Sequence, residues 1–260
     1  MDRNLQRSIN KMVEEISGIF SDCEPSIYLY GSVVLDDFKL GWSDIDILVL
    51  TQKQMTEEQM QKLVGLRQTI LAKEPDNPYY RSFEGGMLTL DAFLRGSADR
   101  IVYWGTSGER ITDRYSFDCF GMAELMESSA LLFGTDIRAH LKTSSFDELY
   151  EGVKQHYETI RRYAQKTDRS IYSFGWMLDI ARCIYTLRTG KIIAKTAAAE
   201  WALEHNLCPD PDALKIALKV RENPLILKEE ETYLDYAETL AEPIQRFADV
   251  LERDLVLAHK

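Results

Sequence analysis

The sequence predicts an α+β fold, in which a mixed sheet flanked by helices precedes an all-α helical bundle. Two observations indicate this division. Residues up to about 137 alternate short apolar runs with amphipathic stretches, which is typical of strands alternating with helices. The residues that follow keep a helical pattern to the end of the chain. We therefore predict one domain over residues 1–137 and a second over residues 138–260.

In the first domain, the expected strands are short apolar runs, and they cover residues 27–30, 44–50 and 87–94. The expected helices have apolar side chains at helical spacing, and they cover residues 3–20, 56–72 and 116–131. Thr56 precedes two acids and reads as the N-cap of the second helix. Gly134 is expected to end the third helix. Residues 101–104 are apolar and aromatic, and we expect them at the rim of a cleft.

The second domain is expected to be helical throughout, beginning with an N-cap near Ser144. Its helices have the apolar spacing of a bundle, and they cover residues 146–165, 170–188, 194–205, 210–221 and 230–256. Gly190 and the pair Asn223-Pro224 supply breaks between them. Helices joined by such short breaks favour a bundle, whose topology the sequence leaves open.

The 260 residues carry a formal net charge of −11. Nucleic-acid phosphates bind basic surfaces, so this charge argues against nucleic acid as the main partner. A polycationic small substrate is compatible with an acidic protein. Acidic proteins are common, however, and the charge alone identifies no partner.

The four cysteines, at positions 23, 119, 183 and 208, lack the spacing of a metal or redox motif. The first residues lack the apolar segment of a secretion signal. No apolar run approaches the ~20 residues that span a bilayer. We therefore expect a cytoplasmic monomer with free thiols and no membrane partner.

One stretch combines a glycine-serine turn with two aspartates. Gly31-Ser32 follows the first strand, and Asp44 and Asp46 share one face of the next because strand side chains alternate. Two carboxylates roughly 6–7 Å apart repel each other unless a cation lies between them. Mg²⁺ suits this position, since it binds one or two carboxylates together with substrate phosphates. A solvated strand start with two surface acids is the alternative interpretation.

The residues Gly31-Ser32 and Ser43-Asp44-Ile45-Asp46 resemble the signature of the nucleotidyltransferase superfamily that includes DNA polymerase beta. Within this superfamily, the sequence around these residues is most similar to that of the aminoglycoside adenylyltransferases. The resemblance implies that Gly31 lets the backbone approach phosphates and that Ser32 donates its hydroxyl to the triphosphate. It also implies that Asp44 and Asp46 hold the metal.

Asp91 is the expected third carboxylate, within the predicted strand over residues 87–94. Burying a lone carboxylate is costly, so Asp91 should be paired, hydrogen-bonded or metal-bound, unless it faces solvent on an edge strand. The resemblance places on this strand the base that takes the proton from the substrate hydroxyl. Relatives carry Glu there, which leaves open whether Asp91 is a base, a third metal ligand or both. Glu84 is the alternative if the strand register differs.

Residues 179–203 are similar to the C-terminal helical domain of the streptomycin and spectinomycin adenylyltransferases, including the run Ala-Ala-Glu-Trp-Ala. This resemblance places Arg182 and Lys195 on basic positions that contact the nucleotide phosphates. Arg182 lies in an otherwise apolar helix, where its guanidinium needs an anion, and phosphate offers a bidentate partner. An ion pair with Asp179, one turn earlier, is the alternative.

The resemblance also implies two residues that bind the antibiotic. Asp168 falls on an acidic substrate-binding position, and Tyr163 on a position where relatives carry tryptophan. A cationic drug requires an acid, although an exposed aspartate between helices is also common. Tyr172 lies where some relatives carry another acid, so substrate recognition is expected to differ. Trp42 either covers the nucleotide or packs in the core or at the rim of the site.

Together these resemblances imply an antibiotic-resistance enzyme that binds ATP with Mg²⁺ in a cleft between the two domains. It would transfer AMP from ATP to a hydroxyl of an aminoglycoside-type antibiotic and release pyrophosphate. Transfer to another acceptor, such as a protein or a tRNA end, is one alternative. Nucleotide binding without catalysis is the other.

Overall fold

The computed structural model describes residues 2–96, 100–105 and 108–258 of the chain. It separates into two compact units. The first unit comprises Met1–Phe38 and Ser43–Thr143, and the second comprises Lys39–Trp42 and Ser144–Lys260. A short loop segment from the first part of the sequence thus belongs to the second unit.

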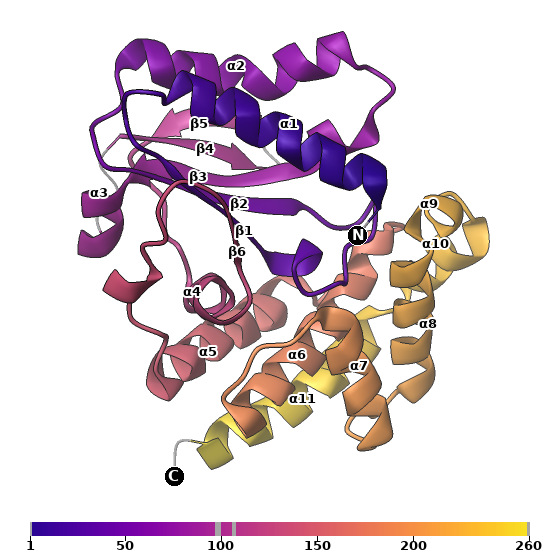
Figure 1. Ribbon diagram of the computed structural model, residues 1–260. Helices are drawn as coiled ribbons and strands as arrows, with labels where there is room; N and C mark the ends of the chain where they lie inside the picture. Colours follow the sequence, from indigo (N-terminus) through magenta and orange to yellow (C-terminus); the bar gives the residue numbers. More distant parts are fainter. Residues whose placement is uncertain (1, 97–99, 106–107, 259–260) are drawn as a thin grey trace. The chain divides into compact units, whose positions relative to one another are not determined.

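The first unit is built on a mixed sheet, which among the described residues has six strands in the order β5-β4-β3-β2-β1-β6 (Figure 1). The strands are β1 Ser26–Tyr30, β2 Ile45–Thr51, β3 Phe83–Thr89, β4 Ile101–Gly105, β5 Gly108–Thr112 and β6 Ala130–Phe133. β2 and β3 run parallel, and the other neighbouring strands are antiparallel. The predicted mixed sheet is therefore confirmed.

Helices cover both faces of this sheet, with α1 Arg3–Ile19 and α2 Glu57–Lys73 on one face and α4 Cys119–Glu127 on the other (Figure 1). The predicted N-cap is confirmed, because Thr56 Oγ1 accepts the Gln59 N–H at 3.2 Å and Gln59 Oε1 accepts the Thr56 N–H at 2.8 Å. Shorter helical turns are η1 Gly31–Val33, η2 Pro78–Ser82, α3 Leu90–Arg95 and η3 Arg138–His140.

Alternation along β2 sends its side chains into two different apolar clusters. Ile45, Ile47 and Val49 pack with residues of α1 and α2. Leu48 and Leu50 pack in the cluster that includes Leu125 of α4. A strand buried on both faces is held firmly in register, because a slip by one residue would exchange the two sets.

Several sequence predictions in this unit are wrong. The strand expected over residues 87–94 ends at Thr89, and α3 begins at Leu90. The helix expected over residues 116–131 is shorter, and Ala130–Phe133 forms β6 beside β1. Gly134 consequently follows a strand, where a Cβ would overlap the Pro25 carbonyl oxygen. Trp104 is fully buried rather than at a rim.

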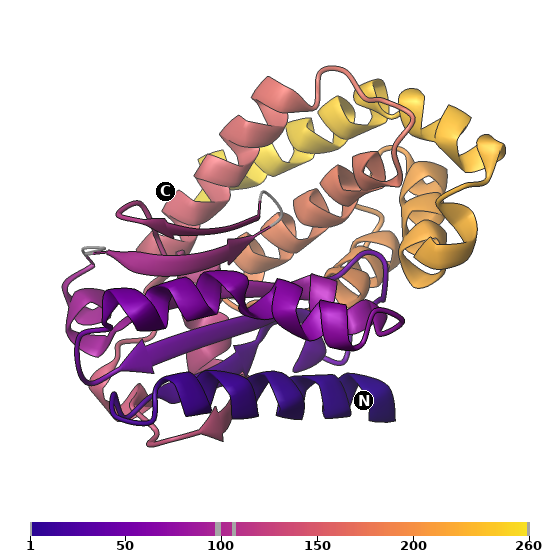
Figure 2. The same ribbon diagram turned by 90° about the horizontal axis from the view of Figure 1, so that it is seen from above.

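The second unit is helical, as predicted. Its elements are α5 Phe146–Tyr163, η4 Ile171–Phe174, α6 Gly175–Thr189, α7 Lys195–Glu204, α8 Pro211–Glu222, α9 Pro224–Leu227, α10 Glu231–Glu238 and α11 Ala241–Ala258. Figure 2 shows α5 and α11 side by side, and α6 packs against both. The predicted helix over residues 230–256 is divided into α10 and α11, and the one over 170–188 into η4 and α6.

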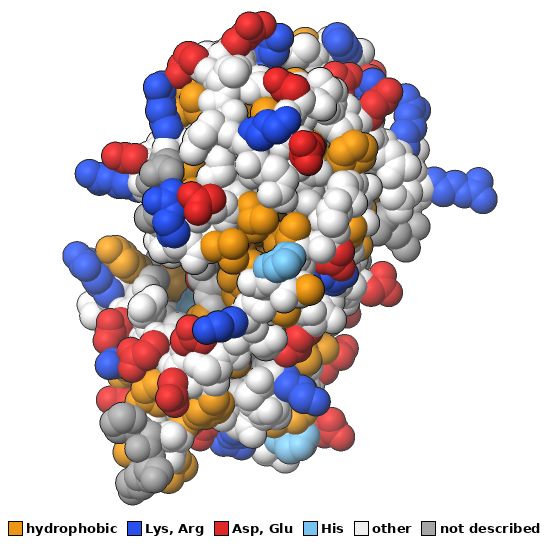
Figure 3. Space-filling model, turned by 60° about the vertical axis from the view of Figure 1, so that its left-hand side comes forward, with side chains coloured by type: hydrophobic (Ala, Val, Ile, Leu, Met, Phe, Trp, Pro, Cys, Tyr) orange, Lys and Arg blue, Asp and Glu red, His pale blue; other side chains and the backbone are white. Residues whose placement is uncertain are grey.

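The surface drawn in Figure 3 carries acidic and basic side chains interspersed, with no continuous basic stripe among the described residues on that face. A search of the described helices finds none with the length and apolar character needed to cross a membrane.

Candidate active site

Gly31 follows β1 directly as the first residue of η1, and its φ of +71° is a conformation that glycine adopts readily. A Cβ on Gly31 would overlap Asp46 Oδ2. The Asp46 carboxylate therefore packs against bare backbone, in the space that any other residue at position 31 would fill. The predicted turn after the first strand is confirmed.

Ser32 ties this turn to the start of β2. Its Oγ donates to the Asp44 carbonyl oxygen at 3.2 Å, and its own carbonyl oxygen accepts the Asp37 N–H at 2.8 Å. The Ser32 side chain is half-buried. A role of this hydroxyl in triphosphate binding stays a prediction.

Asp44 and Asp46 flank the first residue of β2, and both are half-buried. Ile45 and Ile47, which alternate with them, are 0% and 1% exposed in the core on the α1 and α2 side. The sequence prediction that the two acids share a face opposite these isoleucines agrees with this packing.

Glu84 is the carboxylate that the parallel register sets directly across from Asp46. It lies near the start of β3 and is half-buried. Gly85 follows it with a φ of +146°, and a Cβ there would overlap the Ile47 carbonyl oxygen. The glycine thus permits the close approach of β3 to β2 beside the acids.

Asp91 does not lie on the strand. It occupies the first turn of α3, its side chain is 77% exposed, and its Oδ2 lies 2.9 Å from Arg95 Nη2. The strand from Glu84 to Thr89 spans about 16 Å, so Asp91 follows the end of β3 remote from Asp46. The Thr89 hydroxyl, which accepts the Ala92 N–H at 3.1 Å, begins the helix there.

Three tyrosines surround these carboxylates, and the sequence interpretation gave none of them a role in the site. The Tyr103 hydroxyl donates to Glu84 Oε1 at 2.6 Å, and burial together with this bond raises the pKa of Tyr103 to about 12. Burial and the Asp46 charge raise the pKa of Tyr30, which pairs with Asp46 across β1 and β2. Burial likewise raises the pKa of Tyr115. The signal in the sequence was the alternation of side chains along the strand that became β4, which places Tyr103 on the opposite face from Trp104.

The donor set suits Mg²⁺. Asp44 and Asp46 supply hard carboxylate oxygens, and the missing side chain of Gly31 makes room for the Asp46 carboxylate itself. Among the described residues, no three His, Cys, Asp or Glu side chains are grouped to hold a metal alone. In proteins, Mg²⁺ commonly takes its remaining ligands from water and substrate phosphates.

In the second unit, Arg182 and Lys195 meet at one carboxylate. Lys195 Nζ lies 2.8 Å from Asp179 Oδ1, and Arg182 Nη2 lies 3.8 Å from the same atom. Burial opposes ionisation of Asp179, but the charges of Lys195 and Arg182 outweigh it and keep the pKa of Asp179 below its usual value. The alternative pairing of Arg182 with Asp179 is thus present, and Lys195 shares it.

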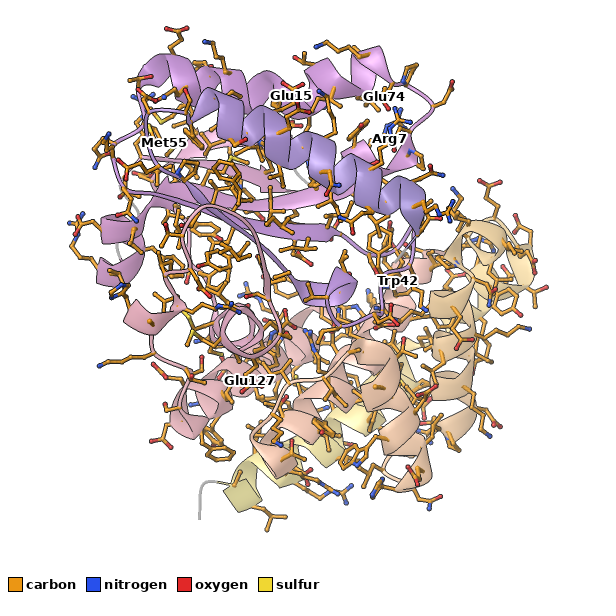
Figure 4. The ribbon with its side chains drawn as sticks, viewed as in Figure 1. Arg7, Glu15, Trp42, Met55, Glu74 and Glu127 are labelled. Atoms are coloured by element: carbon orange, nitrogen blue, oxygen red, sulfur yellow. The ribbon has the colours of Figure 1, made fainter. Side chains whose placement is uncertain are left out.

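The predicted antibiotic-binding residues lie on the surface of the second unit. Asp168 accepts the Ser173 hydroxyl at 3.3 Å, and the Tyr163 ring is 60% exposed. Trp42, labelled in Figure 4, lies with its ring centroid 5.8 Å from that of Tyr172. Trp42 therefore packs on Tyr172 rather than in an apolar core, and the roles of Asp168 and Tyr163 stay predictions.

Two open hollows on the described surface lie elsewhere, along α1 and α2. One of about 860 Å³ is lined by Glu15, and another of about 510 Å³ by Arg7 and Glu74 (Figure 4). None of the predicted site residues lines either hollow.

Comparison with known proteins gives matches in both units. Residues 9–79 match the family model described as nucleotidyltransferase domain, and residues 143–250 match the model described as aminoglycoside adenylyltransferase, C-terminal domain. Over 248 residues the chain is 25% identical to an aminoglycoside (3'') (9) adenylyltransferase of Klebsiella pneumoniae, covering 90% of this chain and 88% of the relative. It is 23% identical over 232 residues to a spectinomycin 9-adenylyltransferase of Staphylococcus aureus, covering 85% and 79%.

A solved structure has the same fold. The crystal structure of the spectinomycin adenyltransferase AAD(9) from Enterococcus faecialis with ATP and spectinomycin aligns with a TM-score of 0.63. The alignment has 15% sequence identity and covers 92% of this chain and 99% of that one. With a nucleotidyltransferase domain followed by the characteristic C-terminal helical domain, the chain belongs to the aminoglycoside adenylyltransferase family.

Proposed function

We propose that this protein transfers AMP from ATP to a hydroxyl group of an antibiotic of the streptomycin and spectinomycin class, and releases pyrophosphate. The observation that carries the proposal is the register that sets Glu84 across from Asp46, beside the turn at Gly31. The family membership and the activities of the relatives support the transfer of an adenylyl group to an antibiotic of this class.

In the proposed reaction, the acceptor oxygen attacks the α-phosphorus of ATP. A new P–O bond forms, the bond from that phosphorus to the oxygen bridging the α- and β-phosphates breaks, and pyrophosphate leaves with the bonding electrons. Glu84 takes the proton of the attacking hydroxyl as general base. This assignment replaces Asp91, whose exposed helical position lies beyond the far end of β3.

Asp44 and Asp46 are proposed to hold Mg²⁺ through their carboxylate oxygens. When bound, the ion would neutralise phosphate charge and align the attacking and leaving oxygens. Gly31 keeps the Asp46 carboxylate against bare backbone, so that its oxygen stays beside the turn. Ser32, whose hydroxyl points to the start of β2, is proposed to donate a hydrogen bond to the triphosphate.

Arg182 and Lys195 are proposed to bind triphosphate oxygens. Their shared contact with Asp179 supports this role, because it brings two cationic side chains from α6 and α7 together. A phosphate group offers the guanidinium a bidentate partner, whereas the 3.8 Å contact with Asp179 is a long one.

Asp168 and Tyr163 are proposed to contact the antibiotic. Asp168 presents an exposed carboxylate, which a cationic drug can pair with, and Tyr163 presents an exposed ring. The Arg162 guanidinium already lies 5.1 Å from the Tyr163 ring centroid, so this ring accepts a cation over its face.

The test is a screen of aminoglycosides and spectinomycin with ATP and Mg²⁺, followed by pyrophosphate assay and mass spectrometry of the drug. We expect at least one antibiotic to gain the mass of one AMP, with an equal amount of pyrophosphate. Adenylylation of a protein or tRNA in place of any drug would contradict the proposed acceptor. Tight ATP binding with no turnover on any acceptor would contradict the proposed activity.

A further inference from the structure

Tyr103 reaches Glu84 from the neighbouring strand. Its hydroxyl donates to Glu84 Oε1 at 2.6 Å, a short distance typical of a bond to an ionised carboxylate. Tyr103 pairs with Gly86 across β3 and β4, and Glu84 lies two residues before Gly86, on the same face of the sheet. The contact is therefore a diagonal one between adjacent strands, which a long aromatic side chain can span.

A glycine makes room for this contact. Gly105 lies two residues after Tyr103 on the same face of β4, and a Cβ there would come within 2.8 Å of the Tyr103 hydroxyl oxygen. The Tyr103 ring thus leans along its own strand over bare backbone. Gly86 likewise makes room for the neighbouring ring of Tyr115, since a Cβ on Gly86 would overlap that ring.

The ring of Tyr103 is also held from its faces and edges. The Arg110 guanidinium of β5 lies 4.8 Å from the ring centroid, and the Tyr115 ring lies 5.8 Å away. A side chain enclosed in this way keeps its rotamer without a bound ligand. The Tyr103 hydroxyl is therefore fixed relative to the sheet. The Glu84 side chain has three rotatable bonds, so its carboxylate would be mobile without such a contact.

We propose that Tyr103 is a positioning residue, which holds the Glu84 carboxylate in place through Oε1 and leaves Oε2 to accept the proton of the substrate hydroxyl. This inference rests on the proposed function of Glu84 as general base. The pKa of Tyr103, raised to about 12 by burial and by the bond to Glu84, keeps the phenol protonated as a donor at neutral pH.

The competing explanation is that Tyr103 only stabilises the sheet. Tyr28 offers a matched control, because its hydroxyl also donates to a carboxylate of the first unit, Asp136 Oδ1 at 3.0 Å. Tyr28→Phe and Tyr103→Phe each remove one hydroxyl from one such bond. Only the second removes it from the proposed base.

The experiment measures single-turnover AMP transfer at saturating ATP and antibiotic, so that slow product release does not hide the chemical step. We expect Tyr103→Phe to slow transfer by about tenfold to a hundredfold. A parallel steady-state titration with ATP is expected to show little change in the KM for ATP. Tyr28→Phe is expected to lower the melting temperature and leave the transfer rate unchanged. An unchanged rate in folded Tyr103→Phe would overturn the proposal.

A double-mutant cycle with Glu84→Gln then shows whether Tyr103 acts through Glu84. We expect Tyr103→Phe to cause almost no further loss once Glu84→Gln is present, because the positioned base is already gone. Independent, multiplying losses would overturn the positioning role while leaving AMP transfer by the wild type intact. A wild type that transfers no AMP would instead refute the proposed function, and the positioning role with it.

Discussion

At the scale of single residues, Gly31 shows how one missing side chain shapes the site. The Asp46 carboxylate occupies the volume that a Cβ at position 31 would need. Glycine is required there twice, once for its φ of +71° and once for this close approach. The backbone turn and the position of a proposed metal ligand are therefore set by the same residue.

We expect Gly31→Ala to lower AMP transfer at least a hundredfold, because Asp46 must move away from the turn. The strained φ should also destabilise the protein by about 1–3 kcal/mol. Gly96→Ala is the control, since Gly96 has a φ of +61° but nothing within 4 Å of its added Cβ. It should show backbone strain and keep its activity. Equal activity loss in both variants, measured as pyrophosphate release, would contradict this account of Gly31.

Variants of Glu84 and Asp91 distinguish between the two candidates for the general base. We expect Glu84→Gln to reduce the rate of AMP transfer by about 10²–10⁴-fold, since a neutral amide cannot take the proton. Asp91→Asn should retain activity, because its carboxylate is exposed and pairs with Arg95. Steady-state rates of the two variants provide the measurement. An inactive Asp91→Asn together with an active Glu84→Gln would restore the assignment expected from the sequence.

At the scale of elements, the boundary between β3 and α3 is the point that a local pattern could not resolve. A short apolar run is compatible with a strand and with a buried helix turn, and residues 87–94 contain both. Thr89 decides the boundary, as its hydroxyl caps α3. β6 was not predicted for another reason: its pairing with β1 joins residues about a hundred positions apart, and a local pattern does not encode such a contact.

Elements with strong local signals were predicted well. The paired hydrogen bonds of Thr56 and Gln59 at the start of α2 agree with the N-cap expected from the sequence. The glycine break at Gly190 is confirmed by its left-handed conformation at the end of α6. Helix starts and stops are encoded within a few residues, whereas strand partners and helix divisions such as that between α10 and α11 depend on tertiary packing.

The α2 cap allows a stability test at this scale. We expect Thr56→Ala to lower the free energy of unfolding by about 1 kcal/mol, because it leaves the Gln59 N–H without its side-chain acceptor. Thr69→Ala is the control in the same helix, where the hydroxyl only donates back to the Gly65 carbonyl oxygen. Urea unfolding of both variants measures the difference. A loss at Thr69 as large as that at Thr56 would refute the capping contribution.

At the scale of the whole molecule, stability should fall toward both ends of the pH range. Hydrogen bonds from Arg138 hold the pKa of Asp136 well below its usual value, so this carboxylate stabilises the fold above the unfolded pKa. That contribution is lost as pH falls below about 4. Burial raises the pKa of its partner Tyr28 to about 12, so stability is lost as pH rises above about 10.

Melting temperatures between pH 3 and pH 7 test the acid side of this prediction. We expect Asp136→Asn to be less stable than the wild type at pH 7 and to lose less stability on acidification. Asp113→Asn, which changes an exposed carboxylate in the loop after β5, is expected to follow the wild-type curve. A pH profile of Asp136→Asn identical to that of the wild type would show that Asp136 does not contribute to the loss of stability in acid.

The two halves of the proposed site differ in how far the sequence predicts them. The turn at Gly31 and the acid pair Asp44 and Asp46 are local in sequence, and the structure places them as expected. Glu84 and Tyr103 depend on the register of β3 against both of its neighbours, which no short motif encodes. The sequence offered Glu84 only as the alternative to Asp91, and the register of the sheet favours it. Tyr103 was identified from the sheet alone.

AMP transfer by this protein is expected to depend on the Asp46 carboxylate. The most direct measurement is mass spectrometry of streptomycin and spectinomycin after incubation with ATP, Mg²⁺ and either the wild type or Asp46→Asn. We predict that the wild type adds one AMP to at least one drug, and that folded Asp46→Asn adds none and releases no pyrophosphate. Transfer by Asp46→Asn at the wild-type rate would show that the reaction does not depend on this carboxylate.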